Sequence, residues 1–307
     1  MTFSSKTASR RNFLAGSLGA AVGACALHAL GTRASLAADA GAKPNLRFGL
    51  ATYQWGMDWD IPTLIANCRK AKVFGVEPRT SSKYAHGIEL DLSVQQRSEI
   101  KKRFADSPVA IVSIACGERM DWPEPEKLKA AIEAAKGYLK LSQDVGSSTV
   151  RIFPNQFHPN VPREKTIEQI AKAANDVGAV AADLGQEVSL EAHGTAGDLT
   201  TMRAIMDQVT RKSVRVRLNC DARDTQGKGL EENFNRVKDY LAHTVHLHGL
   251  KDPKFPYPTL VDLLVKANWD GWALMENSDK VPDRVQALTE QREIWEALVQ
   301  KAMKAGG

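Results

Sequence analysis

Apolar and polar positions divide most of the chain into short apolar runs that alternate with longer amphipathic segments. One of the short runs, residues 109–115, is rich in β-branched residues and apolar at nearly every position, which is typical of a strand buried on both faces of a parallel sheet. The longer segments have apolar residues three or four positions apart, which predicts helices packed against such a sheet. Gly146 and Gly185 each directly follow a predicted helix, where glycine commonly ends one.

This pattern predicts eight strands alternating with eight helices. The predicted strands are residues 46–53, 73–77, 109–115, 150–153, 187–191, 214–221, 244–250 and 271–276. The predicted helices are residues 61–71, 93–104, 124–145, 167–184, 199–208, 230–241, 258–267 and 281–303. Such an alternation over about 265 residues is typical of one α/β domain, a closed (β/α)8 TIM barrel.

The N-terminus has the pattern of an export signal. Arg10 and Arg11 precede a low-charge run, residues 15–30, that is rich in Ala, Gly and Leu. This arrangement predicts a twin-arginine signal peptide over residues 1–40, so that residues 41–307 form the barrel and the twin-arginine (Tat) export machinery delivers it to the periplasm. Cleavage is expected after Ala37 or Ala40. Lipidation of Cys25, which would anchor the protein to a membrane, is the alternative.

Charge and cysteine usage exclude several classes. The formal net charge of +5 falls to about +2 without residues 1–40, and no run of like charge occurs, so nucleic acid is not an expected partner. Cys68, Cys116 and Cys220 lie in or beside apolar runs without C-x-x-C spacing. We therefore expect buried thiols, not disulfides or a structural zinc site.

Polar residues end the later predicted strands. Glu191, Asp221, His248 and Glu276 follow one another at intervals of about 27 to 30 residues, the length of one strand, one helix and two short loops. Strand ends in a parallel barrel share one rim, so these four side chains are expected to converge there. Two Glu, one Asp and one His form an oxygen-rich set suited to one divalent ion, Mn²⁺, Mg²⁺ or Co²⁺.

Two further histidines share faces with these residues. His246 lies on the face of His248 but one pleat deeper, so we expect it to support the site more than to bind the metal. His193 lies on the face of Glu191, where it either contacts a substrate hydroxyl, orients a ligand carboxylate or is simply a histidine of the rim. His158 lies in a loop between prolines, and solvent exposure is expected.

Four other side chains are candidates for substrate contacts, each with a structural alternative. Glu77 and Arg151 end the second and fourth strands, where a buried salt bridge across the barrel is the alternative. Lys251 either neutralises a developing enolate or pairs with a neighbouring acid. Trp55, in a rim loop, either stacks on a sugar face or packs in the core.

The chain resembles the xylose isomerase-like TIM-barrel superfamily of sugar-phosphate isomerases and epimerases, which also includes endonuclease IV. The resemblance covers residues 46 to about 300 and rests on residues 75–77, 150–153, 190–193, 221, 246–249 and 272–276. It implies one divalent metal held by Glu191, Asp221, His248 and Glu276. Two departures stand out. Asp224 replaces a substrate-contacting histidine, and residues 248–252 are one longer than the usual His-x-Lys-Asp, which leaves open whether His246 or His248 is the ligand.

These observations predict an exported, metal-dependent isomerase or epimerase of a non-phosphorylated sugar. Glu191 and Glu276 would remove and return a proton next to a carbonyl. One alternative is a lyase or dehydratase acting on a 3-keto-glycoside, and another is a sugar-binding barrel without catalysis. A nuclease like endonuclease IV is not expected, because its metal cluster requires histidines that the second and third strands lack.

Overall fold

The computed structural model describes residues 44–81 and 83–305. The predicted signal peptide and Cys25 therefore lie outside the described residues. Within the described part, no helix is long and apolar enough to cross a membrane.

The strands form a closed parallel barrel. They are β1 (Asn45–Ala51), β2 (Gly75–Glu77), β3 (Ala110–Ile111), β4 (Ile114–Arg119), β5 (Thr149–Phe153), β6 (Glu187–Glu191), β7 (Val214–Arg217), β8 (Thr244–Leu247) and β9 (Asp270–Met275). They pair in two arcs, β3-β2-β1-β9-β8 and β4-β5-β6-β7. Parallel bridges between Arg79 and Ala115 and between Val216 and Leu241 join the arcs. Because β3 and β4 are two halves of one predicted strand, the predicted eight-stranded barrel is confirmed.

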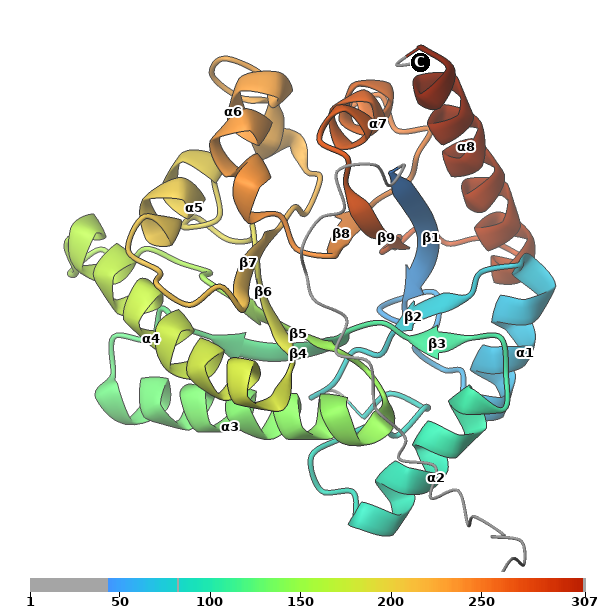
Figure 1. The fold of residues 1–307 in the computed structure, drawn as a ribbon, viewed down its shortest axis with the longest axis horizontal. Helices are drawn as coiled ribbons and strands as arrows, with labels where there is room; N and C mark the ends of the chain where they lie inside the picture. Colours follow the sequence, from blue (N-terminus) through green and yellow to red (C-terminus); the bar gives the residue numbers. More distant parts are fainter. Residues whose placement is uncertain (1–43, 82, 306–307) are drawn as a thin grey trace, which may run out of the picture. The chain divides into compact units, whose positions relative to one another are not determined.

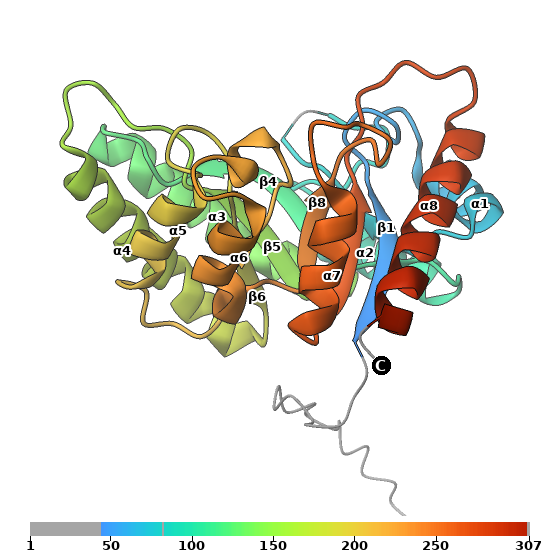
Figure 2. The ribbon, with the colours of Figure 1, turned by 90° about the horizontal axis from the view of Figure 1, so that it is seen from above.

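The helices surround the strands (Figure 1). They are α1 (Ile61–Ala71), α2 (Val94–Ala105), α3 (Pro125–Val145), α4 (Arg163–Leu184), α5 (Leu199–Met206), α6 (Leu230–Val237), α7 (Tyr257–Lys266) and α8 (Arg284–Ala305). Seen from the side, the loop from β9 to α8 rises at one rim (Figure 2). Ser93 and Gln96 form a capping box at the start of α2, and Gly146 and Gly185 end α3 and α4 with left-handed backbones.

Two predicted boundaries were wrong in ways that affect the site. β7 ends at Arg217, because the backbone of Cys220 is left-handed (φ 53°) and interrupts the alternation of the strand. Asp221 then caps the short 3₁₀ helix η1 (Ala222–Thr225) instead of ending a strand. β8 ends at Leu247, so His248 lies beyond the strand.

Two large side chains of β9, Trp272 and Leu274, pack against glycines of β2 and β1. A Cβ atom at Gly75 would lie 2.4 Å from the Trp272 ring, and one at Gly49 would lie 2.5 Å from Leu274. Neither glycine can therefore be replaced without moving a neighbour.

We expect Gly75→Ala to destabilise the barrel by about 1–3 kcal/mol, because the added methyl overlaps the Trp272 ring. Gly117→Ala is the matched control, since its nearest neighbour is the Ser81 side chain at 3.9 Å. Its effect should stay within about 0.5 kcal/mol. Urea unfolding of both variants measures the difference, and equal midpoints would contradict the packing described.

Candidate active site

His246 is the centre of a buried cluster at the carboxyl ends of the strands. It lies on the inner face of β8 and is fully buried. Its Nε2 is 2.6 Å from Oε1 of Glu77 on β2. Its Nδ1 is 3.2 Å from Oε2 of Glu191 on β6 and 3.2 Å from Oε2 of Glu276, which follows β9. We call Glu77, Glu191, His246 and Glu276 the glutamate–histidine cluster.

Two fully buried arginines compensate the charge of this cluster. Nη1 of Arg217 is 2.6 Å from Oε2 of Glu77, and its Nη2 donates a 2.7 Å hydrogen bond to Ser113. Nε of Arg151 is 3.3 Å from Oε2 of Glu191. A salt bridge across the barrel was one reading of Glu77 and Arg151, but the partner of Glu77 is Arg217. Sequence reasoning missed Arg217, although an arginine on the inner face of an apolar strand was a visible signal.

The protonation states follow from burial and from these contacts. Burial alone would raise the pKa of Glu77 and Glu191, but nearby arginines and His246 reverse this and lower both values. Burial likewise opposes the charge of His246, but Glu191, Glu276 and Glu77 together raise its pKa well above the ordinary value. The cluster by itself therefore holds three carboxylates around an imidazolium.

The structure brings together two of the four predicted metal ligands, Glu191 and Glu276. The Asp221 carboxylate accepts hydrogen bonds from the backbone and side chain of Arg223. Nδ1 of His248 is 3.0 Å from the backbone oxygen of Glu276, and its backbone N–H donates a hydrogen bond to the Tyr257 hydroxyl. His246, not His248, thus lies between the two glutamates.

Comparison with known proteins assigns the chain to a family. Residues 65–298 match the model of the family described as xylose isomerase-like TIM barrel. The chain belongs to this family. Among curated proteins, no significant sequence match was found.

Three solved structures illustrate what this xylose isomerase-like barrel is similar to. An L-ribulose 3-epimerase matches with a TM-score of 0.71 and 14% identity, over 85% of this chain and 97% of that one. A 3-keto-D-glucoside 4-epimerase from E. coli matches with 0.69 and 15%, over 82% and 100%. The IOLI protein, with a bound zinc atom, matches with 0.67 and 12%, over 84% and 97%. At these identities the likeness shows the fold.

The donor atoms of the cluster suit a divalent cation. In the conformation described, no group of three or more His, Cys, Asp or Glu side chains among residues 44–81 and 83–305 is placed to hold a metal ion. The kinds of atoms nevertheless fit, because two carboxylate oxygens meet one imidazole nitrogen whose ring is fixed by Glu77 on its other side. Glu191 Oε2 and His246 Nδ1 are both buried and lie 3.2 Å apart, without hydrogen-bond geometry between them. A metal ion would bind these atoms in place of the proton of the imidazolium.

Asn219, on the extension of β7, is a further oxygen donor. It follows Arg217 by two positions and is buried, and its Oδ1 has no hydrogen-bond partner among the described residues. By strand alternation Asn219 shares the face of Arg217, and the left-handed backbone of Cys220 interrupts this alternation before Asp221.

The other predicted contact residues surround the cluster. Nδ1 of His193 is 3.3 Å from Asn155, and its ring packs on Phe153. Trp55 is buried, and its indole N–H donates a hydrogen bond to the backbone oxygen of Asp279. This favours a packing role for Trp55 over stacking on a sugar.

His248 and Lys251 line a separate pocket at the rim. This pocket measures about 420 Å³ and also includes Asn277 and Asp279. Lys251 itself is exposed, with its Nζ 3.7 Å from Glu290. His158 is not simply solvent-exposed as expected, since its Nε2 lies 3.0 Å from the buried Asp121.

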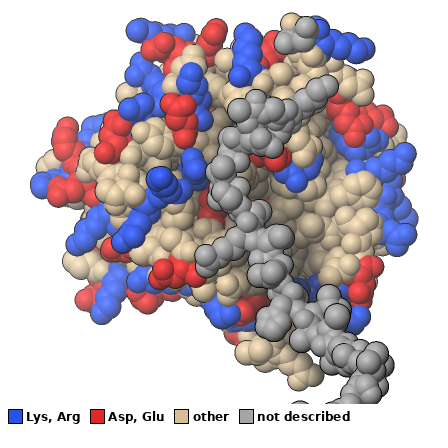
Figure 3. All heavy atoms as spheres, in the orientation of Figure 1, with Lys and Arg blue, Asp and Glu red and all other residues tan. Residues whose placement is uncertain are grey.

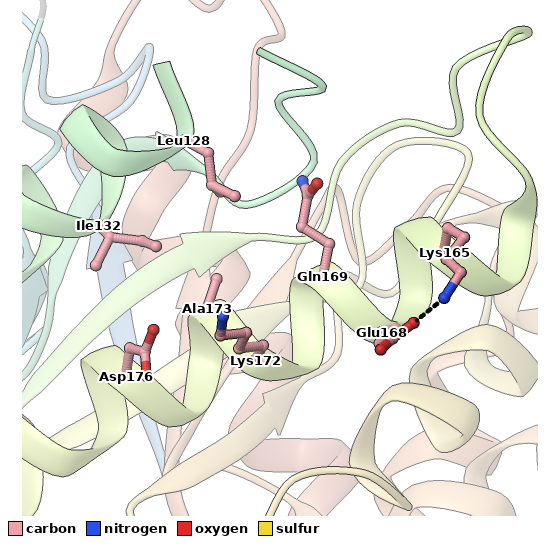
Figure 4. A pocket seen from close by; sticks show the side chains of 8 residues that line it. All are labelled: Leu128, Ile132, Lys165, Glu168, Gln169, Lys172, Ala173 and Asp176. Atoms are coloured by element: carbon pink, nitrogen blue, oxygen red, sulfur yellow. Dashed lines mark hydrogen bonds and ion pairs between the residues drawn. The ribbon is translucent and has the colours of Figure 1, made fainter. Parts of the chain in front are cut away.

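The parts of the outer surface shown in Figures 3 and 4 have no cluster comparable to the glutamate–histidine cluster. A groove of about 280 Å³ runs between α3 and α4, with Leu128 and Ile132 on one side and the ion pair of Lys165 and Glu168 on the other (Figure 4). On the face shown in Figure 3, basic and acidic side chains are interspersed.

Proposed function

We propose that the protein is an isomerase or epimerase that moves a proton at a carbon next to the carbonyl of a sugar. The observation that carries the proposal is the pair Glu191 and Glu276, whose carboxylate oxygens both lie 3.2 Å from His246 Nδ1. In TIM barrels the carboxyl ends of the strands hold the active site. Two carboxylates on different strands there can serve as base and acid for the two faces of one carbon.

Each residue of the cluster has a role in this proposal. Glu276 is the more accessible carboxylate, with 13% of its side chain exposed against 3% for Glu191, so it takes the proton from the substrate. Glu191 returns a proton from the other side. Glu77 holds the His246 ring in place through a 2.6 Å contact, and Arg217 in turn holds the Glu77 carboxylate at 2.6 Å.

We further propose that Glu191, Glu276 and His246 Nδ1 hold one divalent cation, of the Mn²⁺, Mg²⁺ or Co²⁺ type. This revises the ligand set expected from the sequence. Such an ion would act as a Lewis acid and would lower the pKa of the C–H on the carbon next to the substrate carbonyl. The zinc atom bound in the IOLI protein supports the presence of a metal. Transport to the periplasm remains part of the proposal.

The relatives support this reaction class and also its nearest rival. Two of the similar structures are epimerases of sugars, one of them acting on an oxidised 3-keto-D-glucoside. A lyase on such a substrate would use the same acidified C–H but would expel a leaving group from the resulting intermediate. The two reactions differ in whether the mass of the sugar is conserved.

The test is incubation of the protein in D₂O with Mn²⁺ and a panel of ketoses, sugar acids and 3-keto-glycosides, followed by NMR and mass spectrometry. An isomerase or epimerase incorporates deuterium next to the carbonyl and forms a product of otherwise unchanged composition. Loss of a substituent with formation of an unsaturated sugar would establish the lyase. Binding without any exchange across the panel would leave a sugar-binding barrel and overturn the proposal.

A further inference from the structure

Arg151 is a buried cation whose hydrogen-bonding capacity is unused. Its side chain is fully buried, and none of its three guanidinium nitrogens has a hydrogen-bond partner. Its only ion pair, from Nε to Glu191 at 3.3 Å, lacks hydrogen-bond geometry. Buried guanidinium groups in folded proteins are normally hydrogen-bonded, because desolvating them is costly.

Arg79 lies beside Arg151 and, unlike Arg151, has no carboxylate partner among the described residues. It follows β2, its Nε is buried without a hydrogen-bond partner, and it forms no ion pair among the described residues. The two guanidinium groups share the ring of Phe153, with distances from ring centre to Cζ of 3.9 Å for Arg151 and 5.9 Å for Arg79. Two like charges are therefore held close to each other next to Glu191.

The net charge of the site indicates what charge the substrate carries. The three carboxylates of the glutamate–histidine cluster are balanced by Arg217, Arg151 and Arg79, before His246 is counted. A proton on His246, or a divalent cation in its place, leaves the site positive. A neutral sugar brings no charge to compensate this, whereas an anionic substrate does.

We infer that the substrate is a sugar acid whose carboxylate binds between Arg151 and Arg79. The guanidinium fork matches the two oxygens of a carboxylate, and the unused N–H groups of Arg151 supply the donors. Phe153 provides an apolar floor under both cations. The carboxylate lies next to Glu191, which places the reacting carbon between the arginine pair and Glu276. This inference rests on the proposed function for the reaction and adds the substrate class.

A phosphate presents the same anionic chemistry to arginine, but it is bulkier and carries more charge. The guanidinium fork is planar and matches the two oxygens of a planar carboxylate, so the smaller group is the better match. The experiment therefore compares both anions.

The test is calorimetric binding, without added metal, to the Glu276→Gln protein, which retains the arginine pair but lacks both the proposed base and one proposed metal ligand. The probes are D-glucuronate, D-galacturonate and a 2-keto-hexonate, against the matching neutral hexoses and hexose 6-phosphates. We expect at least one sugar acid to bind ten-fold or more tightly than its neutral counterpart. Adding Arg79→Gln should remove that preference by about ten-fold, since a charge-assisted contact is lost.

Two further variants keep the result interpretable. Arg151→Lys retains the charge but loses the fork, and it should weaken binding of the acid without affecting neutral sugars. Arg119→Gln is the matched control, because this arginine already has a carboxylate partner, Asp121 at 2.7 Å, and it should leave the preference unchanged. No preference for any sugar acid, an equal or greater preference for hexose phosphates, or a preference that survives Arg79→Gln would each overturn the inference. Because binding is measured without turnover, these outcomes are independent of whether the reaction itself has been assigned correctly.

Discussion

Replacement of Glu276 by Gln should abolish turnover while the barrel stays folded. The amide preserves the size of the side chain but cannot accept a proton from a C–H group. Burial raises the pKa of Glu276, but His246 more than offsets this and the net shift is downward, so the carboxylate is ionised and able to act as a base at neutral pH. Loss of a general base typically costs about 10²–10⁴-fold in rate. We expect kcat to fall by that factor.

Glu290→Gln is the control for this experiment. Its carboxylate lies on α8, is about half exposed, and contacts only Lys251 among the ion pairs described. Its rate should equal that of the wild type, and the melting temperatures of both variants should remain within a few degrees of it. A Glu276→Gln protein that exchanges deuterium at the wild-type rate would remove Glu276 from the chemistry.

The fold could be predicted because its signals are local and repeated. The strands contain short apolar runs and the helices are amphipathic, so the order of elements followed from the sequence pattern. Glu191 was placed correctly because it closes a strand whose alternation is unbroken. Glu276 was placed correctly because its backbone nitrogen, 2.7 Å from the Leu247 oxygen, extends the pairing of β9 with β8 by one residue.

The structure places Asp221, His248 and the partner of Glu77 differently from the expectation, for reasons that no periodicity reveals. The left-handed backbone of Cys220 turns Asp221 out of the strand pattern, and a non-glycine residue gives little warning of such a conformation. The hydroxyl of Tyr257, on α7, binds the backbone of His248 just past the end of β8. Glu77 pairs with Arg217 because these two inward side chains meet across the barrel. Strand alternation predicts which side chains point inward, but it does not predict which of them meet.

The most informative remaining result concerns the two histidines. We expect Mn²⁺ to raise the melting temperature of the wild type and of His248→Ala, and to have little effect on His246→Ala. His246 Nδ1 faces both glutamates, whereas His248 Nδ1 is 3.0 Å from a backbone oxygen. Loss of a supporting residue around a metal typically weakens its binding by about 10–100-fold, so loss of a ligand should cost at least about 100-fold. Calorimetric titration with Mn²⁺ measures both variants directly.

The pH dependence provides an independent check of the same assignment. Since the carboxylates raise the pKa of His246 in the metal-free protein, a metal ion must displace a proton from its ring. The melting shift produced by Mn²⁺ should therefore shrink as pH falls and protons compete for the site. His246→Gln, which keeps a polar group in the buried space, serves where His246→Ala unfolds. If either His246 variant keeps the full Mn²⁺ response while His248→Ala loses it, the ligand is the histidine beyond the strand, and the buried imidazole serves only to hold three glutamates together.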